Sequence, residues 1–144
     1  MGFYKNYIGM IKDIPNLKVE DIALAAVPTP NAETNEDEWY IYLINKKDKA
    51  IENVLVSSKG YGEMNKEKVE TSELRHYIEV IPAMGYAKIE AIMPELFAIS
   101  NQYWVSFYIG KEIFDKKYVF VAESIQKSNL TDVPVIGKKG VLLS

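Results

Sequence analysis

His76 is the residue around which this chain could build catalysis, because it is the only histidine in 144 residues. A nucleophilic serine needs an adjacent general base, and that base needs a third group to orient it. Ser58 and Ser72 could supply the nucleophile, and Glu73 or Glu79 could orient the imidazole. A hydrolase or transferase centred on His76 is therefore one hypothesis.

The spacing around His76 does not favour that chemistry. If residues 71–82 form a strand, side chains alternate between its faces, so His76 shares a face with Leu74 and points away from Glu79. The G-x-S-x-G motif that exposes a nucleophilic serine does not occur in the sequence. We therefore predict no catalytic residue, and interpret His76 as an edge or partly buried side chain that hydrogen-bonds to backbone.

Two other segments could hold an ion or a small ligand. The acidic run TNEDE (34–38) offers oxygen ligands, but one histidine and scattered carboxylates lack the spacing of zinc or calcium motifs. The glycines of KGYG (59–62) could cradle a phosphate, but the G-K-[ST] of a phosphate-binding loop is missing. We interpret TNEDE as a solvated loop and KGYG as glycines that supply turns of positive φ. The sequence therefore predicts no metal site and no cofactor.

Aromatic residues are more plentiful than one buried face requires. The chain has ten tyrosines and two tryptophans. Tyr40 and Tyr42 lie on the second face of one predicted strand, and Trp104 and Tyr108 lie on the second face of another. A sandwich strand needs only one apolar face, so something should cover these rings. The alternatives are the chain's own termini, another protein, or a sugar that stacks on exposed rings.

Composition excludes several classes of function. Lysine and arginine number 17 against 20 acidic residues, so the net charge of −3 gives no basic footprint for nucleic acid. There is no cysteine, which excludes disulfides, thiol catalysis and a thiolate zinc site. No stretch approaches the ~20 apolar residues of a membrane helix. Residues 1–15 lack the features of a secretion signal, so we expect a cytoplasmic protein without membrane or nucleic-acid partners.

Short apolar segments separated by turn residues predict an all-β fold. Residues 3–13 have helical spacing and end at Pro15, which predicts a short amphipathic helix. The sequence divides into an N-terminal helix and linker (1–20), a β-sandwich (21–124) and a polar C-terminal tail (125–144). Strands are expected at 21–28, 39–45, 50–58, 71–82, 86–92, 102–109 and 112–123, with NKKDK joining the second and third as a hairpin and Gly110-Lys111 joining the last two.

One segment resembles a known structural corner. LFAISNQYWVSFY (96–108) resembles the E–F corner of fibronectin type III and related immunoglobulin-like domains, where an apolar residue and a short bend precede a tyrosine. The resemblance implies that Tyr103 is the corner tyrosine, with Leu96 or Phe97 as the apolar residue. Its hydroxyl would then bond to a backbone group a few residues upstream and close the corner.

Further resemblances extend over more of the chain. YLINKKDKAIENVLVSS (42–58) is similar to a hairpin common in bacterial immunoglobulin-like accessory domains. The chain as a whole is similar to small uncharacterised bacterial proteins, some labelled phenylalanyl-tRNA synthetase α subunit. Synthetase cores of that class need a large sheet and signature arginines, whereas Arg75 is the only arginine here. The resemblance therefore implies at most an accessory subunit in tRNA aminoacylation.

We predict an immunoglobulin-like β-sandwich of about seven strands with a short N-terminal helix. Its predicted function is that of a non-catalytic interaction module that binds a protein partner or itself. The alternatives are an enzyme centred on His76 and the accessory subunit. The residues predicted to bind are Tyr40, Tyr42, Tyr61, Arg75, His76, Trp104 and Tyr108.

Overall fold

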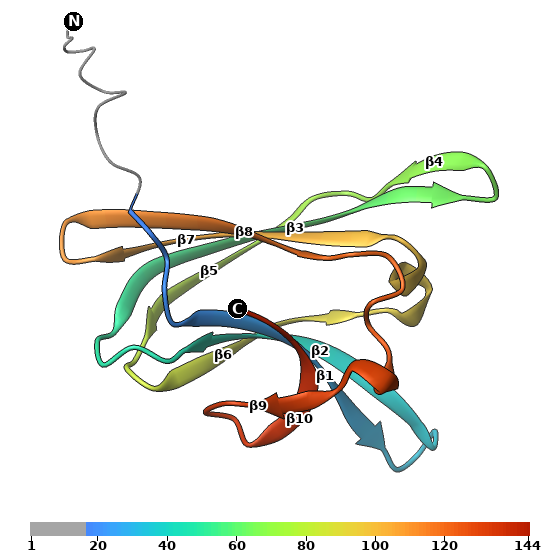
Figure 1. The fold of residues 1–144 in the computed structure, drawn as a ribbon, viewed down its shortest axis with the longest axis horizontal. Coiled ribbons are helices and arrows are strands. Elements are labelled where there is room, and N and C mark those ends of the chain that lie inside the picture. Colours follow the sequence, from blue (N-terminus) through green and yellow to red (C-terminus); the bar gives the residue numbers. More distant parts are fainter. Residues whose placement is uncertain (1–16) are drawn as a thin grey trace, which may run out of the picture.

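The computed structural model describes residues 17–144, and the helix expected at 3–13 lies outside them. Within the described residues, strands form two antiparallel sheets that face each other (Figure 1). The first sheet has the order β6-β2-β1-β10-β9, and the second has the order β4-β3-β7-β8 with β5 also paired to β3. The strands are β1 (Ile22–Asn31), β2 (Glu36–Asn45), β3 (Ile51–Met64), β4 (Glu67–Glu70), β5 (Leu74–Ile81), β6 (Gly85–Ile92), β7 (Ser100–Ile109), β8 (Glu112–Phe120), β9 (Thr131–Val133) and β10 (Lys138–Leu143).

The core lies between the sheets because residues alternate along each strand. On β7, Tyr103, Val105 and Phe107 point inward and are at most 1% exposed, while Trp104 and Tyr108 point outward. The all-β prediction is therefore confirmed. The turn between β7 and β8 is also as predicted, since Gly110 adopts φ +61° at its first position.

The hairpin predicted between residues 39–45 and 50–58 is wrong. β2 pairs with β1 and β6 in the first sheet, whereas β3 pairs with β4, β5 and β7 in the second. The connecting loop therefore crosses from one sheet to the other. Asn45 is fully buried there, and its Nδ2 donates to the carbonyl oxygens of Lys49, Ile81 and Pro82 at 2.9 to 3.2 Å. This asparagine fixes the crossing, and its Oδ1 also accepts from the Lys47 N–H at 3.0 Å, which closes a local turn at the start of the loop.

β1 continues beyond residue 28, where we expected it to end, and includes Pro28 and Pro30. Pro28 pairs with Trp39 and Pro30 pairs with Asp37 on β2. On its other side β1 pairs with β10 only over Leu24 to Ala26. The prolines therefore lie where β1 is an edge strand, and their missing N–H groups cost no ladder bond.

The glycines of KGYG lie inside β3 rather than in a loop, which corrects the expectation of positive-φ turns. A Cβ on Gly60 would come within 3.0 Å of Ile99 Cδ1, and one on Gly62 within 2.9 Å of Ile99 Cγ2. Both glycines therefore allow β3 to pass close to the buried Ile99 side chain.

The C-terminal segment is also more ordered than a polar tail. β10 pairs with β1 and β9 pairs with β10, so the first sheet continues beyond β1. Val135, Ile136 and Leu142 pack against a second small apolar cluster that includes the buried Tyr42 ring. The chain itself thus covers part of the outer face of the first sheet.

Candidate functional site

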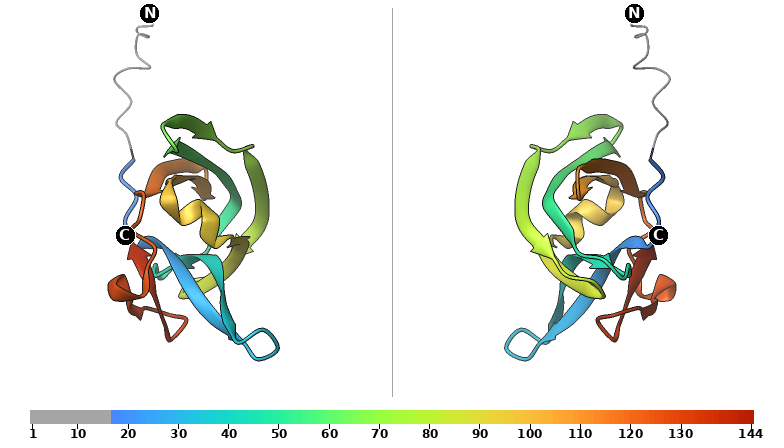
Figure 2. Two further views of the ribbon diagram at one scale, coloured as in Figure 1. Left: turned by 90° about the vertical axis from the view of Figure 1, so that its right-hand side faces the viewer. Right: turned by 90° about the vertical axis from the view of Figure 1, so that its left-hand side faces the viewer.

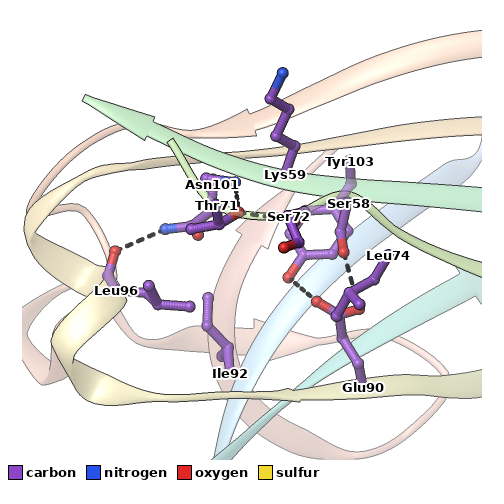
Figure 3. Close-up of a pocket in the computed structure, with 11 residues that line it drawn as sticks. Ser58, Lys59, Thr71, Ser72, Leu74, Glu90, Ile92, Leu96, Asn101 and Tyr103 are labelled. Carbon is purple, nitrogen blue, oxygen red and sulfur yellow. Dashed lines mark hydrogen bonds between the residues drawn. The ribbon is translucent and has the colours of Figure 1, made fainter. Parts of the chain in front are cut away.

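Glu90 is the polar centre of the interior, and its carboxylate joins the two sheets. It comes from β6 in the first sheet and accepts hydrogen bonds from three strands of the second. Its Oε1 accepts from Ser58 Oγ on β3 at 3.0 Å and lies 2.7 Å from His76 Nε2 on β5. Its Oε2 accepts from the Tyr103 hydroxyl on β7 at 2.9 Å. Figure 3 shows the bonds from Ser58 and Tyr103 converging on the carboxylate.

A bulge in β6 turns Glu90 inward. Simple alternation places Glu90 on the outward face with Lys88, but Lys88 pairs with Tyr42 and Glu90 with Ile41, which are adjacent on β2. Ile89 is therefore an extra residue, and it reverses the alternation that follows it. Sequence reasoning missed Glu90 for this reason, because nothing in YAKIEAI (86–92) marks the position of the bulge.

A pocket of about 200 Å³ lies beside this carboxylate. The 3₁₀ turn η2 (Pro94–Ala98) closes one end of the space between the sheets, where Figure 2 shows it in gold. Asn101 is buried next to η2, and its Nδ2 donates to the carbonyl oxygens of Leu96 and Ile99. The pocket lining mixes the apolar side chains of Leu74, Ile92 and Leu96 with the polar side chains of Ser58, Lys59, Thr71 and Ser72. Ligand sites for larger molecules typically enclose about 300–1,000 Å³.

The arrangement does not form a catalytic triad. Ser58 donates to Glu90 rather than to His76, so the imidazole is not the group that contacts the serine hydroxyl. Neither Glu73 nor Glu79 orients the imidazole, which contacts Glu90 instead. The pKa of Tyr103 lies well above its ordinary value because the ring is buried and because Glu90 places a negative charge beside the hydroxyl. A tyrosine held protonated in this way contributes structure rather than a general base.

The corner bond implied for Tyr103 is also wrong. The side chain is buried as expected, but its hydroxyl bonds to Glu90 and not to a nearby backbone group. Asn101 performs the corner's task, since its amide holds the η2 carbonyl oxygens described above. In the resembled corner one tyrosine closes the bend, whereas here Asn101 closes it and Tyr103 bonds to Glu90.

The outer face of the second sheet is the other candidate surface, and we call it the outer face hereafter. Leu55 pairs with Tyr77 on one side and with Ser106 on the other. Ser106 is flanked along β7 by Trp104 and Tyr108, which point to the same side. The large apolar side chains on this face that are between 38% and 59% exposed include Leu55, Tyr77, Trp104, Tyr108 and Ile113.

The predicted binding residues separate into three groups. Arg75, Tyr61, Trp104 and Tyr108 lie on strands of the second sheet and are exposed. His76 points inward to Glu90, as described. Tyr40 and Tyr42 lie in the first sheet, so the four aromatic rings do not form one face.

The two tyrosines of the first sheet already have neighbours. Tyr42 is buried beside the Tyr86 ring, with centroids 5.9 Å apart. Tyr40 donates to Glu38, which raises the pKa of its hydroxyl, and carries Lys88 Nζ over its ring at 3.8 Å. The exposed outer-face residues that we did not predict are Leu55, Tyr77 and Ile113, whose outward alternation was the available signal.

Within residues 17–144, no group of three or more histidine and acidic side chains gathers in a way that could hold a metal. In the same part of the chain, no helix has the length and apolar character needed to cross a membrane. No protein-family model matches the chain, and no curated protein matches its sequence.

Proposed function

We propose that this chain is a non-catalytic protein-interaction module that binds through the outer face. The observation that carries the proposal is the contiguous exposure of large apolar side chains there. Single exposed apolar residues are ordinary, whereas a contiguous patch is typical of an interaction site. Tyrosine, tryptophan and arginine are also the residue types enriched where proteins meet, and the patch holds Tyr77, Trp104 and Tyr108 beside Arg75.

The charges around this patch define the chemistry of the partner. Arg75 and Lys117 lie level with Trp104, because Ser57 pairs with Arg75 and Trp104, and Trp104 pairs with Lys117. Further along the same strands, Glu52 lies level with Tyr108. Asp115 is paired with Ser106, between the two levels. The partner surface should therefore be apolar at its centre, with its charges in the opposite order.

We infer that the scaffold is immunoglobulin-like, as in fibronectin type III domains. Its support is the strand order, since β1, β2 and β6 are neighbours in one sheet and β3, β7 and β8 in the other. This matches the A-B-E and C-F-G groupings of such domains. Two features depart from the pattern: β9 and β10 extend the first sheet, and Tyr103 bonds to a side chain.

The test compares three immobilised forms of the chain in lysate of the source cells. The first is the wild type, and the second is Leu55→Ser/Trp104→Ser, which removes two apolar side chains from the outer face. The third is the control Met84→Ser/Met93→Ser, which removes two side chains that are similarly exposed but lie outside the second sheet. All three should melt at similar temperatures, because every changed residue is exposed.

The proposal predicts that proteins held by the wild type and by the control, including further copies of the chain, are lost from the Leu55→Ser/Trp104→Ser form. Mass spectrometry of the retained proteins gives the comparison. If all three forms retain the same proteins in the same amounts, the outer face is not the binding surface.

A further inference from the structure

We infer that the partner that fits the outer face is a second copy of this chain, docked face to face about a two-fold axis. The inference rests on the proposed function, since it names the partner of the same surface. It begins from the observation that the face carries Arg75 and Lys117 at the level of Trp104, Asp115 at the next level and Glu52 at the level after that. A surface with this polarity is complementary to itself once one copy is reversed.

The clearest part of the pattern lies on β8. Asp115 and Lys117 are two residues apart, so both side chains point to the outer face. Both are exposed, and among the described residues neither forms an ion pair. Each is therefore available to an opposite charge from outside the chain.

Symmetry determines how the two copies are oriented. A level here means the residues that pair with one another across neighbouring strands. A two-fold axis parallel to the strands would place each level of one copy on the same level of the other, so that cations would face cations. A two-fold axis that crosses the strands between the levels of Trp104 and Ser106 reverses the order. Lys117 of each copy then faces Asp115 of the other, and Arg75 of each faces the Tyr77 ring of the other. Both contacts occur twice, and the second can form a cation–π interaction.

The same axis also brings Lys59, which forms an ion pair with Glu70 of its own chain, towards Glu52 of the second copy, because Lys59 and Glu52 lie at the outer levels of β3. Leu55 and Trp104 lie beside the axis, at the centre of the contact. The apolar side chains would thus be buried at the centre of the dimer contact, while the charges around them determine the orientation in which the two copies dock. This gives the patch an occupant with matching charge order and a matching apolar centre.

The experiment uses sedimentation equilibrium on the full chain and its variants, over a range of protein concentrations at low salt. Lys117→Glu and Asp115→Lys each place like charges together twice in the dimer, so each should weaken the dimer about 100-fold. An equimolar mixture of the two variants should restore a dimer close to wild-type affinity, because both pairs are then opposite in charge. The matched control is Lys138→Glu, which makes the same charge change on β10 in the other sheet and should leave the dimer unchanged.

The outcomes separate this inference from the proposed function. Association of the wild type, loss in each single variant and recovery in the mixture support the two-fold dimer. A wild type that stays monomeric overturns it, while retention of other proteins that depends on Leu55 and Trp104 would still support the interaction module. If the charge variants weaken the dimer but Leu55→Ser/Trp104→Ser does not, the contact lies at the β8 edge, and this result would also overturn face-to-face docking.

Discussion

Replacing Glu90 by alanine should destabilise the domain more than any change of an exposed glutamate. The substitution removes the acceptor of three hydrogen bonds that join the sheets. The Tyr103 side chain is 1% exposed and Ser58 is 6% exposed, so their hydroxyl groups would lose their partner inside the protein. His76 is less affected, because about a third of its side chain is in contact with solvent.

The magnitude follows from these two buried hydroxyl groups. A buried polar group left without a partner costs about 1–3 kcal/mol. Two such groups give about 2–6 kcal/mol, and water entering from the adjacent pocket reduces the upper end. We therefore expect the free energy of unfolding to fall by about 2–4 kcal/mol. Glu90→Gln should cost less, about 1–2 kcal/mol, because the amide keeps the shape and can still accept two of the bonds.

Urea unfolding followed by tryptophan fluorescence measures this change at one fixed protein concentration, so that association does not alter the comparison. The matched control is Glu63→Ala, an exposed position near the end of β3. It should change the free energy of unfolding by no more than about 0.5 kcal/mol. If Glu90→Ala and Glu63→Ala are equally stable, the carboxylate does not hold the sheets together and the reasoning is wrong.

Three further changes should also be measurable by urea unfolding. The pKa of Tyr103 and of Tyr118 lies above 10.0 because both rings are buried, with Glu90 adding to the effect at Tyr103. The unfolded chain releases these protons near pH 10 and the folded chain does not. The stabilisation is therefore complete below pH 10, and the free energy of unfolding falls above pH 10 by up to about 1.4 kcal/mol per pH unit for each tyrosine. Tyr118→Phe should reduce this slope, and an unchanged slope would contradict a raised pKa of Tyr118. Asn45→Ala should cost about 2–4 kcal/mol, because it leaves buried carbonyl groups unpaired at the crossing between the sheets; a loss below 0.5 kcal/mol would show that water replaces the amide. Gly62→Ala should cost about 1–3 kcal/mol through contact with Ile99, and the cost should shrink when Ile99 is itself alanine, because that change removes Cγ2 at 2.9 Å and keeps only Cβ at 3.0 Å. Equal costs in both backgrounds would exclude the contact with Cγ2 as the cause.

Local patterns in the sequence were enough to predict the features that depend on strand alternation and on turn chemistry. The inward set on β7 follows from period-two alternation, and the Gly110 turn follows from the need for positive φ. The β2–β3 connection could not be predicted in the same way. Its residues have turn chemistry, but which strands pair is decided by distant segments. The available signal was β2 itself, since a strand that is apolar on both faces is typical of the middle of a sheet.

The interior site was hidden for a different reason. A one-residue bulge at Ile89 decides whether Glu90 faces water or the core, and β6 has no glycine or proline at that point to mark it. His76 was identified from the sequence, but its partner lies 14 residues away on the opposite sheet. The outer face was easier to foresee, because Trp104 and Tyr108 stood out as aromatic side chains on the second face of an already apolar strand.

The most direct test of the outer face as a binding surface is the accessibility of Trp104 in solution. In a Trp39→Phe background, Trp104 is the only tryptophan, and its fluorescence can be quenched by acrylamide at increasing protein concentration. The side chain is 44% exposed in the single chain. We predict efficient quenching in dilute solution and clear protection as the chains associate. Efficient quenching that stays the same at every protein concentration would contradict a face that further copies of the chain cover.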